Sequence, residues 1–152
     1  MMVKNPEKFI PALVEAGVEY ISIHQESTIH LLRVILLIKE LGAKAGVVVN
    51  PGTSIELIRP VINEIDYILL MTVNPGLGGQ KLYPPIFNKI KETRKLIEGR
   101  NIEIQVDGGI NDQNIVECYK AGANWFVVGS YLFTENINER LISLENILKK
   151  EH

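Results

Sequence analysis

The residues of this sequence best suited to chemistry begin with a glycine-rich loop. The loop, residues 74–80, reads Asn-Pro-Gly-Leu-Gly-Gly-Gln and places three glycines within four positions. Glycines let a backbone approach a ligand closely and turn several N–H groups towards an anion. Neither a Walker sequence nor a G-x-G-x-x-G sequence is present, so a nucleotide motif is not supported. The alternative interpretation is a loop that simply needs turns.

Asp107 is the candidate acid–base residue. It follows an apolar run and precedes Gly108 and Gly109, which leave space around its carboxylate. A carboxylate in such a place suits proton transfer or metal ligation. The alternative is that Asp107 caps a turn, but Asn111 is better placed to cap the helix predicted to follow.

Other candidates are weaker when taken singly. Gly129 and Ser130 follow the last predicted strand and resemble the phosphate site that many (β/α)8 barrels build after their last two strands. Taken alone, the pair is an ordinary turn. The three histidines, His24, His30 and His152, fall at a strand end, at a helix start and at the last residue. This spacing predicts no convergent histidine cluster for a metal.

The elements that must position these residues alternate between strands and helices. Most of the apolar runs are nearly continuous, as expected for parallel strands buried on both faces. Predicted strands cover residues 18–23, 44–49, 66–71, 102–106 and 124–128. Predicted helices cover residues 6–16, 28–41, 54–62, 85–97, 111–121 and 137–148.

This alternation predicts an α/β protein with a parallel sheet and helical crossovers. An open doubly wound sheet and an arc of a barrel both fit the pattern. In either architecture, the functional residues lie at the carboxyl ends of the strands. Asp107, the glycine-rich loop and Gly129 all occupy such positions.

The composition limits the possible classes of function. The 152 residues are 46% apolar and carry no linker, so we expect a single domain over residues 1–152. A net charge of −2 argues against a nucleic-acid partner. The single cysteine excludes an internal disulfide framework and fits a reducing, cytoplasmic setting. The apolar runs are far shorter than the roughly 20 residues that cross a bilayer, and residues 1–6 contain no signal-peptide core.

Several strings in the sequence, taken together and in order, resemble the ribulose-phosphate 3-epimerase family of (β/α)8 barrels. The similarity covers essentially the whole chain. The matching strings are residues 2–6, 24–26, 44–53, 71–80, 106–110 and 129–130. The resemblance implies an incomplete barrel, in which this chain supplies strands four to eight with their helices.

The resemblance also implies an isomerase that interconverts ribulose 5-phosphate and xylulose 5-phosphate in the pentose phosphate pathway. In the family, two aspartates move a proton at C3 and a divalent metal ion (Zn, Fe, Mn or Co) stabilises the oxyanion. Asp107 matches one of these aspartates, as acid–base residue and metal ligand. Met71 would line the pocket. The residues expected to bind the sugar phosphate are Gly76, Leu77, Gly78, Gly79, Gly108, Gly109, Gly129 and Ser130.

The chain departs from the family at its start. The family's other metal ligands and its second aspartate belong to strands that have no counterpart here, so we expect impaired epimerase activity. Two alternatives stay open, namely a non-catalytic phosphosugar-binding or assembly module and a relative of the allulose-phosphate 3-epimerases. Because an open arc exposes strand edges, we also expect self-association into a homo-oligomer.

Overall fold

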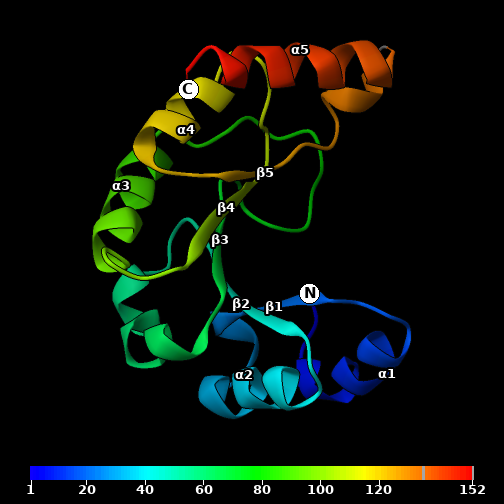
Figure 1. The fold of residues 1–152 in the computed structure, drawn as a ribbon, viewed down its shortest axis with the longest axis vertical. Helices are drawn as coiled ribbons and strands as arrows, with labels where there is room; N and C mark the ends of the chain where they lie inside the picture. Colours follow the sequence, from blue (N-terminus) through cyan, green and yellow to red (C-terminus); the bar gives the residue numbers. More distant parts are fainter. Residues whose placement is uncertain (135, 152) are drawn as a thin grey trace.

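Five parallel strands form one sheet in the computed structural model, which describes residues 1–134 and 136–151 (Figure 1). Each of the five predicted strands is confirmed, with its ends within two residues of the prediction. The strands are β1 (Tyr20–His24), β2 (Lys44–Val49), β3 (Tyr67–Met71), β4 (Glu103–Asp107) and β5 (Trp125–Val127).

The strand order separates the two architectures that the pattern left open. The order is β1-β2-β3-β4-β5, and every neighbouring pair is parallel. A doubly wound sheet reverses its order at a switch point, whereas here strands that follow one another in the chain are also neighbours in the sheet. The sheet is therefore an arc of a barrel, and Figure 1 shows the helices following its outer side.

Within the described residues, five α-helices and four 3₁₀ segments connect and flank the strands. The α-helices are α1 (Ile10–Glu15), α2 (Leu31–Glu40), α3 (Ile86–Leu96), α4 (Ile115–Ala121) and α5 (Ile137–Lys149). The 3₁₀ segments are η1 (Pro6–Lys8), η2 (Gln25–Ser27), η3 (Ile55–Glu64) and η4 (Leu132–Thr134).

Prolines explain the main departures from the predicted helices. The segment predicted as one helix over residues 6–16 is divided into η1 and α1, and Pro11 sits in the first turn of α1. Pro60 lies inside η3, where an α-helix was expected. Proline removes a backbone donor and crowds the preceding turn, so the tighter 3₁₀ form replaces the α-helix there. Asn114, rather than Asn111, occupies the N-cap position of α4.

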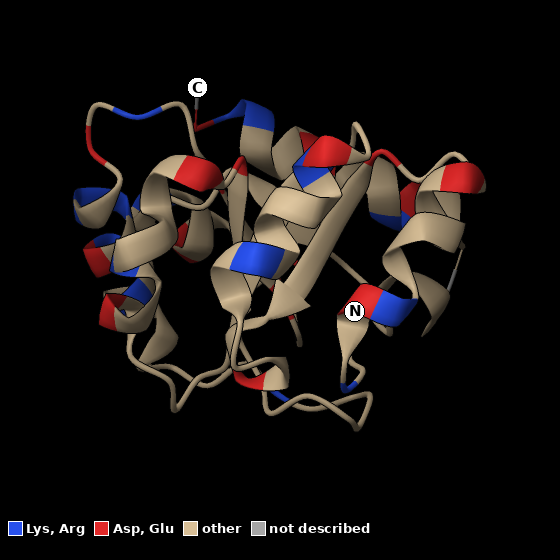
Figure 2. Cartoon of the chain, turned by 90° about the horizontal axis from the view of Figure 1, so that it is seen from below, with Lys and Arg blue, Asp and Glu red and all other residues tan. Residues whose placement is uncertain are grey.

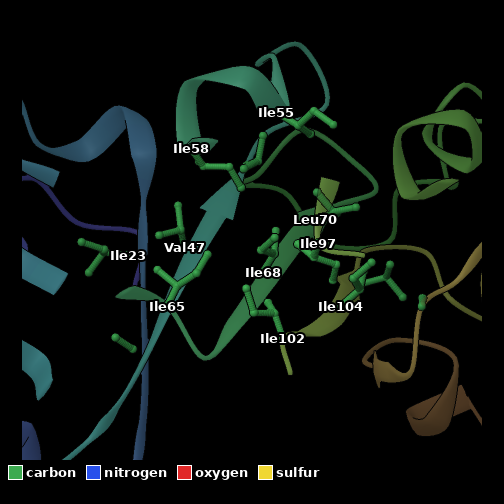
Figure 3. Packing of buried hydrophobic residues seen from close by; sticks show 14 of the residues in the cluster. Ile23, Val47, Ile55, Ile58, Ile65, Ile68, Leu70, Ile97, Ile102 and Ile104 are labelled. Carbon is green, nitrogen blue, oxygen red and sulfur yellow. The ribbon is translucent and has the colours of Figure 1, made fainter. Parts of the chain in front are cut away.

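The main core lies between the sheet and the helices on its outer side (Figure 3). Strand residues that point outwards, such as Ile23, Val47, Ile68 and Ile104, are completely buried there. Burying an aliphatic side chain of this size contributes about 1.5–3 kcal/mol relative to exposure. This layer therefore holds the helices against the outer side of the sheet.

The inner side of the arc is filled differently at its two ends. At the amino ends of the strands, the rings of Tyr20, Tyr67 and Trp125 pack at centroid distances of 5.4–6.1 Å. The Tyr67 ring covers Gly46, where a Cβ atom would overlap it. The carboxyl ends of the strands are left for the loops that carry the candidate site. None of the described helices is long and apolar enough to cross a membrane.

Candidate functional site

A cavity of about 360 Å³ opens at the carboxyl ends of β3, β4 and β5. The strand register places three lining residues of the cavity side by side, because Met71 pairs with Asp107, and Asp107 pairs with Val127. The structure places all ten of the predicted site residues around this one cavity. They are Met71, Gly76, Leu77, Gly78, Gly79, Asp107, Gly108, Gly109, Gly129 and Ser130.

Asp107 is the last residue of β4 and is half-buried at the mouth of the arc. Its carboxylate accepts no hydrogen bond from residues 1–134 or 136–151. Burial disfavours the charged form and raises the pKa of Asp107 above its ordinary value. A carboxyl group in this environment is suited to accept and return a proton.

The turn after Asp107 requires glycine. Gly108 and Gly109 have φ values of 122° and 65°, a backbone region that residues with a Cβ rarely adopt. A Cβ atom on Gly109 would lie 2.6 Å from the backbone oxygen of Gln80 and from the backbone nitrogen of Leu82. The glycine-rich loop therefore packs directly on this turn, and the two segments form one wall of the cavity.

Side chains from the neighbouring elements hold this turn in place. Thr72 donates its hydroxyl hydrogen to the carbonyl oxygen of Gly108. The amide Nδ2 of Asn114 donates to the carbonyl oxygen of Gly109 at 2.8 Å. The Asp107 carboxylate is thus carried on a backbone that is hydrogen-bonded from both sides.

The glycine-rich loop is closed by its own last residue. The side-chain amide of Gln80 donates to the carbonyl oxygens of Asn74, at 2.6 Å, and of Leu77, at 2.8 Å. These bonds use the loop's carbonyl groups. The backbone N–H groups of Gly78 and Gly79, by contrast, donate to no other group of the described chain.

The segment after β5 resembles the glycine-rich loop in the way its backbone groups are hydrogen-bonded. The carbonyl oxygens of Gly129 and Ser130 accept from the N–H groups of Leu132, at 2.9 Å, and Phe133, at 3.2 Å, as the chain enters η4. The N–H groups of Gly129 and Ser130 themselves donate to no acceptor within residues 1–134 and 136–151. Free N–H groups from two loops on one cavity are suited to bind an anion such as a phosphate.

The described residues do not fit a divalent metal ion. Over residues 1–134 and 136–151, no three His, Cys, Asp or Glu side chains come together as a possible metal site. Asp107 is the only titratable residue among the described residues that line the cavity, and one carboxylate is too few ligands for such an ion. The expected role of Asp107 as a metal ligand therefore has no supporting neighbours in this part of the chain. His152 lies outside the described residues.

His24 lies beside the site rather than in it. It lines a second small cavity together with Met2, Pro75 and Gly76, and these three residues also line the main cavity. Its ring nitrogen Nδ1 lies 3.6 Å from a carboxylate oxygen of Glu26. Burial lowers the pKa of His24, and the nearby Glu26 carboxylate partly offsets this effect.

An ionic clamp holds the turn after β2, and neither of its two charged residues was predicted to have a role. The ammonium group of Lys89 donates to the carbonyl oxygens of Asn50, Pro51 and Thr53 at 2.9, 2.6 and 2.7 Å. The Glu26 carboxylate accepts from the Asn50 N–H at 3.3 Å and from the Thr53 hydroxyl. The clamp joins three elements that are distant in sequence, so no local spacing could have indicated it.

Met2 is one of the lining residues that were not predicted, together with Val73, Ile110 and Val127. The amino group of Met1 donates to the carbonyl oxygen of Ser22 at 2.5 Å, so the first residues run beside β1. This contact brings Met2 to the edge of the cavity. The only signal in the sequence was that residues 2–6 belong to the strings that carry the resemblance.

Cys118 and Trp125 lie away from the candidate site. Cys118 is buried in α4, and burial raises the pKa of its thiol to about 12. Trp125 is only partly buried, because it faces the inner side of the arc. Neither residue lines the cavity.

Comparison with known proteins places this architecture in context. Residues 1–133 match the family model described as the ribulose-phosphate 3 epimerase family. The chain is 47% identical over 135 residues to the ribulose-phosphate 3-epimerase of Aquifex aeolicus, covering 88% of this chain and 61% of that protein. It is 42% identical over 146 residues to the Bacillus subtilis ribulose-phosphate 3-epimerase, covering 94% of this chain and 67% of that protein. The chain therefore spans about two thirds of the length of these relatives.

Solved structures show the same fold at low sequence identity. KGPDC from Streptococcus mutans superposes with a TM-score of 0.74 and 11% identity, covering 97% of this chain and 68% of that chain. The 3-hexulose-6-phosphate synthase of Salmonella typhimurium superposes with a TM-score of 0.73 and 18% identity, covering 99% of this chain and 71% of that chain. These similarities describe the fold alone.

Proposed function

The chain belongs to the ribulose-phosphate 3-epimerase family, and we propose that it carries the phosphate-binding side and one acid–base residue of a sugar-phosphate 3-epimerase site. The observation that carries the proposal is the single cavity in which the free N–H groups of two loops and the Asp107 carboxyl meet. Its substrate would be ribulose 5-phosphate or xylulose 5-phosphate, the pair on which the family acts.

In this proposal, the two loops bind the phosphate through their backbones. The N–H groups of Gly78, Gly79, Gly129 and Ser130 would bind its oxygens, and the glycine conformations allow that close approach. Met71 supplies an apolar floor beside Asp107. Fixing the phosphate would orient the sugar so that one face of C3 is presented to the carboxyl group.

Asp107 alone can serve only one face of C3. Epimerisation removes the proton from one face of that carbon and returns a proton to the opposite face. No second titratable side chain lines the cavity in the described chain. We therefore expect this polypeptide, taken by itself, to bind the sugar phosphate and to turn it over slowly or not at all.

Calorimetry and an activity assay test the two parts of the proposal separately. The purified chain should bind D-ribulose 5-phosphate and should not measurably bind D-ribulose, which lacks the phosphate. A coupled epimerase assay with added divalent metal should detect little turnover. Absence of ribulose 5-phosphate binding would contradict the binding proposal. Near-normal turnover that Asp107→Asn abolishes would contradict the expectation of impaired activity.

The same experiment addresses the two alternatives. Binding with no detectable turnover would favour a non-catalytic phosphosugar-binding module, whereas slow turnover that Asp107→Asn abolishes would favour the epimerase site. Tighter binding of allulose 6-phosphate than of ribulose 5-phosphate would favour the allulose-phosphate branch. Self-association remains a proposal, supported by the open edges of β1 and β5. A cytoplasmic setting is likewise a proposal, supported by the single, unpaired Cys118.

A further inference from the structure

His24 is a buried polar residue whose ring lacks a close hydrogen bond. The polar residues buried among the described ones are His24, Thr72 and Thr93. Each threonine donates its hydroxyl hydrogen to a backbone carbonyl oxygen. The ring nitrogen Nδ1 of His24, by contrast, lies 3.6 Å from the nearest carboxylate oxygen of Glu26, which is longer than an ordinary hydrogen bond. A buried polar group of this kind is suited to meet a ligand.

The surroundings of the His24 ring favour a ligand that donates a hydrogen bond. Burial lowers the pKa of His24, and the side chains of Glu26 and Asn50 partly offset this effect by accepting from the ring. The ring is therefore neutral near neutral pH, and one of its two nitrogens is an acceptor. Because both neighbours act as acceptors, that nitrogen needs a donor such as a sugar hydroxyl.

Strand β1 directs His24 towards the inner side of the arc. Ile21 and Ile23 belong to the outer core, so the alternation of side chains along β1 places His24 on the opposite face. Asp107 occupies the same face of β4, where Ile104 and Val106 point outwards. Because the sheet is curved, side chains on the inner face of β1 and β4 converge towards the axis of the arc.

A separate hollow connects His24 with the candidate site. The His24 cavity, lined by residues 2–4, 24, 26, 27, 75 and 76, has a volume of about 360 Å³. Its residues Met2, Pro75 and Gly76 also line the main cavity. The two cavities are therefore neighbours along one wall, and a ligand longer than the main cavity can extend from one into the other.

The proposed position of the phosphate decides which end of the sugar points towards His24. The phosphate of a pentulose 5-phosphate is attached to C5, and C1 and C2 lie on the other side of C3. In the sheet, the order from one edge is β5, which precedes Gly129 and Ser130, then β4 with Asp107, and finally β1 with His24 at the far edge. Acidic and basic residues are interspersed on the face of the described chain that Figure 2 shows, so no single-sign patch there would hold the phosphate elsewhere.

We propose that the His24 cavity binds the C1–C2 end of the ketose phosphate and that His24 accepts a hydrogen bond from a hydroxyl group there. This inference rests on the proposed function and deepens it, because it assigns recognition of the ketose end to a residue outside the phosphate loops. A few polar groups in an otherwise apolar pocket commonly fix the orientation of a ligand in this way. Glu26 is the positioning residue, since its carboxylate accepts from the ring and leaves the other nitrogen for the sugar.

Calorimetry with two phosphate ligands of different length tests the proposal on the whole chain. D-Ribulose 5-phosphate carries the C1–C2 end, whereas sn-glycerol 3-phosphate reproduces only the part from C3 to the phosphate. The wild type should bind ribulose 5-phosphate more tightly than glycerol 3-phosphate. His24→Phe keeps a ring of similar size and removes both nitrogens, so it should weaken ribulose 5-phosphate binding by about tenfold. It should leave glycerol 3-phosphate binding unchanged.

Two further variants separate a direct contact from a structural effect. His24→Gln restores a polar side chain and should recover most of the lost affinity for ribulose 5-phosphate. His30→Phe is the matched control, because His30 is exposed and lies outside both cavities, and it should change neither affinity. Circular dichroism checks that all three variants remain folded.

The outcomes distinguish this inference from the function on which it rests. Equal affinity of the wild type for the two ligands overturns the inference, as does a His24→Phe variant that weakens both ligands alike or neither. Failure of His24→Gln to recover any affinity also overturns the assigned hydrogen bond. Absence of binding of both ligands to the wild type would contradict the proposed function itself, and the inference would fall with it.

Discussion

The outer and inner faces of the sheet come from the same five strands but are stabilised in different ways. On the outer face, helices cover a continuous core whose strand residues are completely buried, as Ile68 and Ile104 show. On the inner face, the carboxyl half holds a separate, smaller cluster of Val48, Leu69, Met71 and Val73. The outer face thus supplies most of the apolar burial, and the inner face keeps space for a ligand.

The loops at the inner face depend on hydrogen bonds more than on burial. Gly108 is held by Thr72, Gly109 by Asn114, and the glycine-rich loop by Gln80. Such bonds fix backbone positions without filling the cavity. The difference between the faces shows that hydrogen bonds position the backbone of the site, while sparse packing leaves the cavity accessible.

Two adjacent leucines of β3 test this comparison with the same chemical change. Leu70 faces the outer core and is completely buried, whereas Leu69 belongs to the inner cluster and is 9% exposed. We expect Leu70→Ala to lower the free energy of unfolding by about 4 kcal/mol and Leu69→Ala by about 2 kcal/mol. Chemical denaturation of both variants measures the two values. Equal losses would show that the faces contribute equally to stability.

The hydrogen-bonded wall of the cavity is tested by a pair of glycines. Gly109→Ala forces a Cβ atom against the Gln80 and Leu82 backbone at a positive φ, so we expect a loss of about 1–3 kcal/mol in stability. Binding of ribulose 5-phosphate should weaken at least tenfold. Gly78→Ala is the control, because a Cβ atom there meets nothing within 4 Å, and it should retain wild-type stability. Comparable destabilisation by both substitutions would contradict the close packing of the two loops.

Asp107→Asn should give the smallest change, and its pH dependence identifies its cause. Burial raises the folded-state pKa of Asp107, so ionisation of this group costs stability as the pH rises through the interval between its ordinary and raised values. Below that interval the carboxyl is neutral in both the folded and unfolded states, and the variant and wild type should melt alike. Above it, the variant should melt slightly higher. Thermal melts across acidic to neutral pH measure the difference, and a difference that is independent of pH would exclude this explanation.

Much of the fold could be read from local patterns. Apolar runs located all five strands. Most of these runs are nearly continuous, as expected for strands buried on both faces, and the run over residues 44–49 coincides with β2. The prediction that functional residues lie at strand ends pointed to Asp107, Gly109 and Ser130, which line one cavity in the structure. Their roles in binding and catalysis stay predictions, which the experiments above address.

The features that the sequence did not predict depend on contacts between distant segments or on single backbone atoms. Apolar spacing is similar in α- and 3₁₀-helices, so the effect of Pro60 on η3 was missed. The clamp between Lys89 and the carbonyl groups of the turn after β2 joins residues that no short window contains. Met2 reaches the site next to the hydrogen bond between the Met1 amino group and Ser22 of β1.

The sequential strand order also has a consequence for how the chain folds. Each strand pairs only with its neighbours along the chain. Each pairing therefore closes a loop made of one connecting segment, and it does not require the other end of the sheet to be formed. Loop closure therefore costs about the same at every step, and the sheet can grow outwards from any formed pair, as stacked repeats do. By the same logic, the short β5 at one edge can detach while β2 and β3 stay paired, which would be measured as early hydrogen exchange in β5.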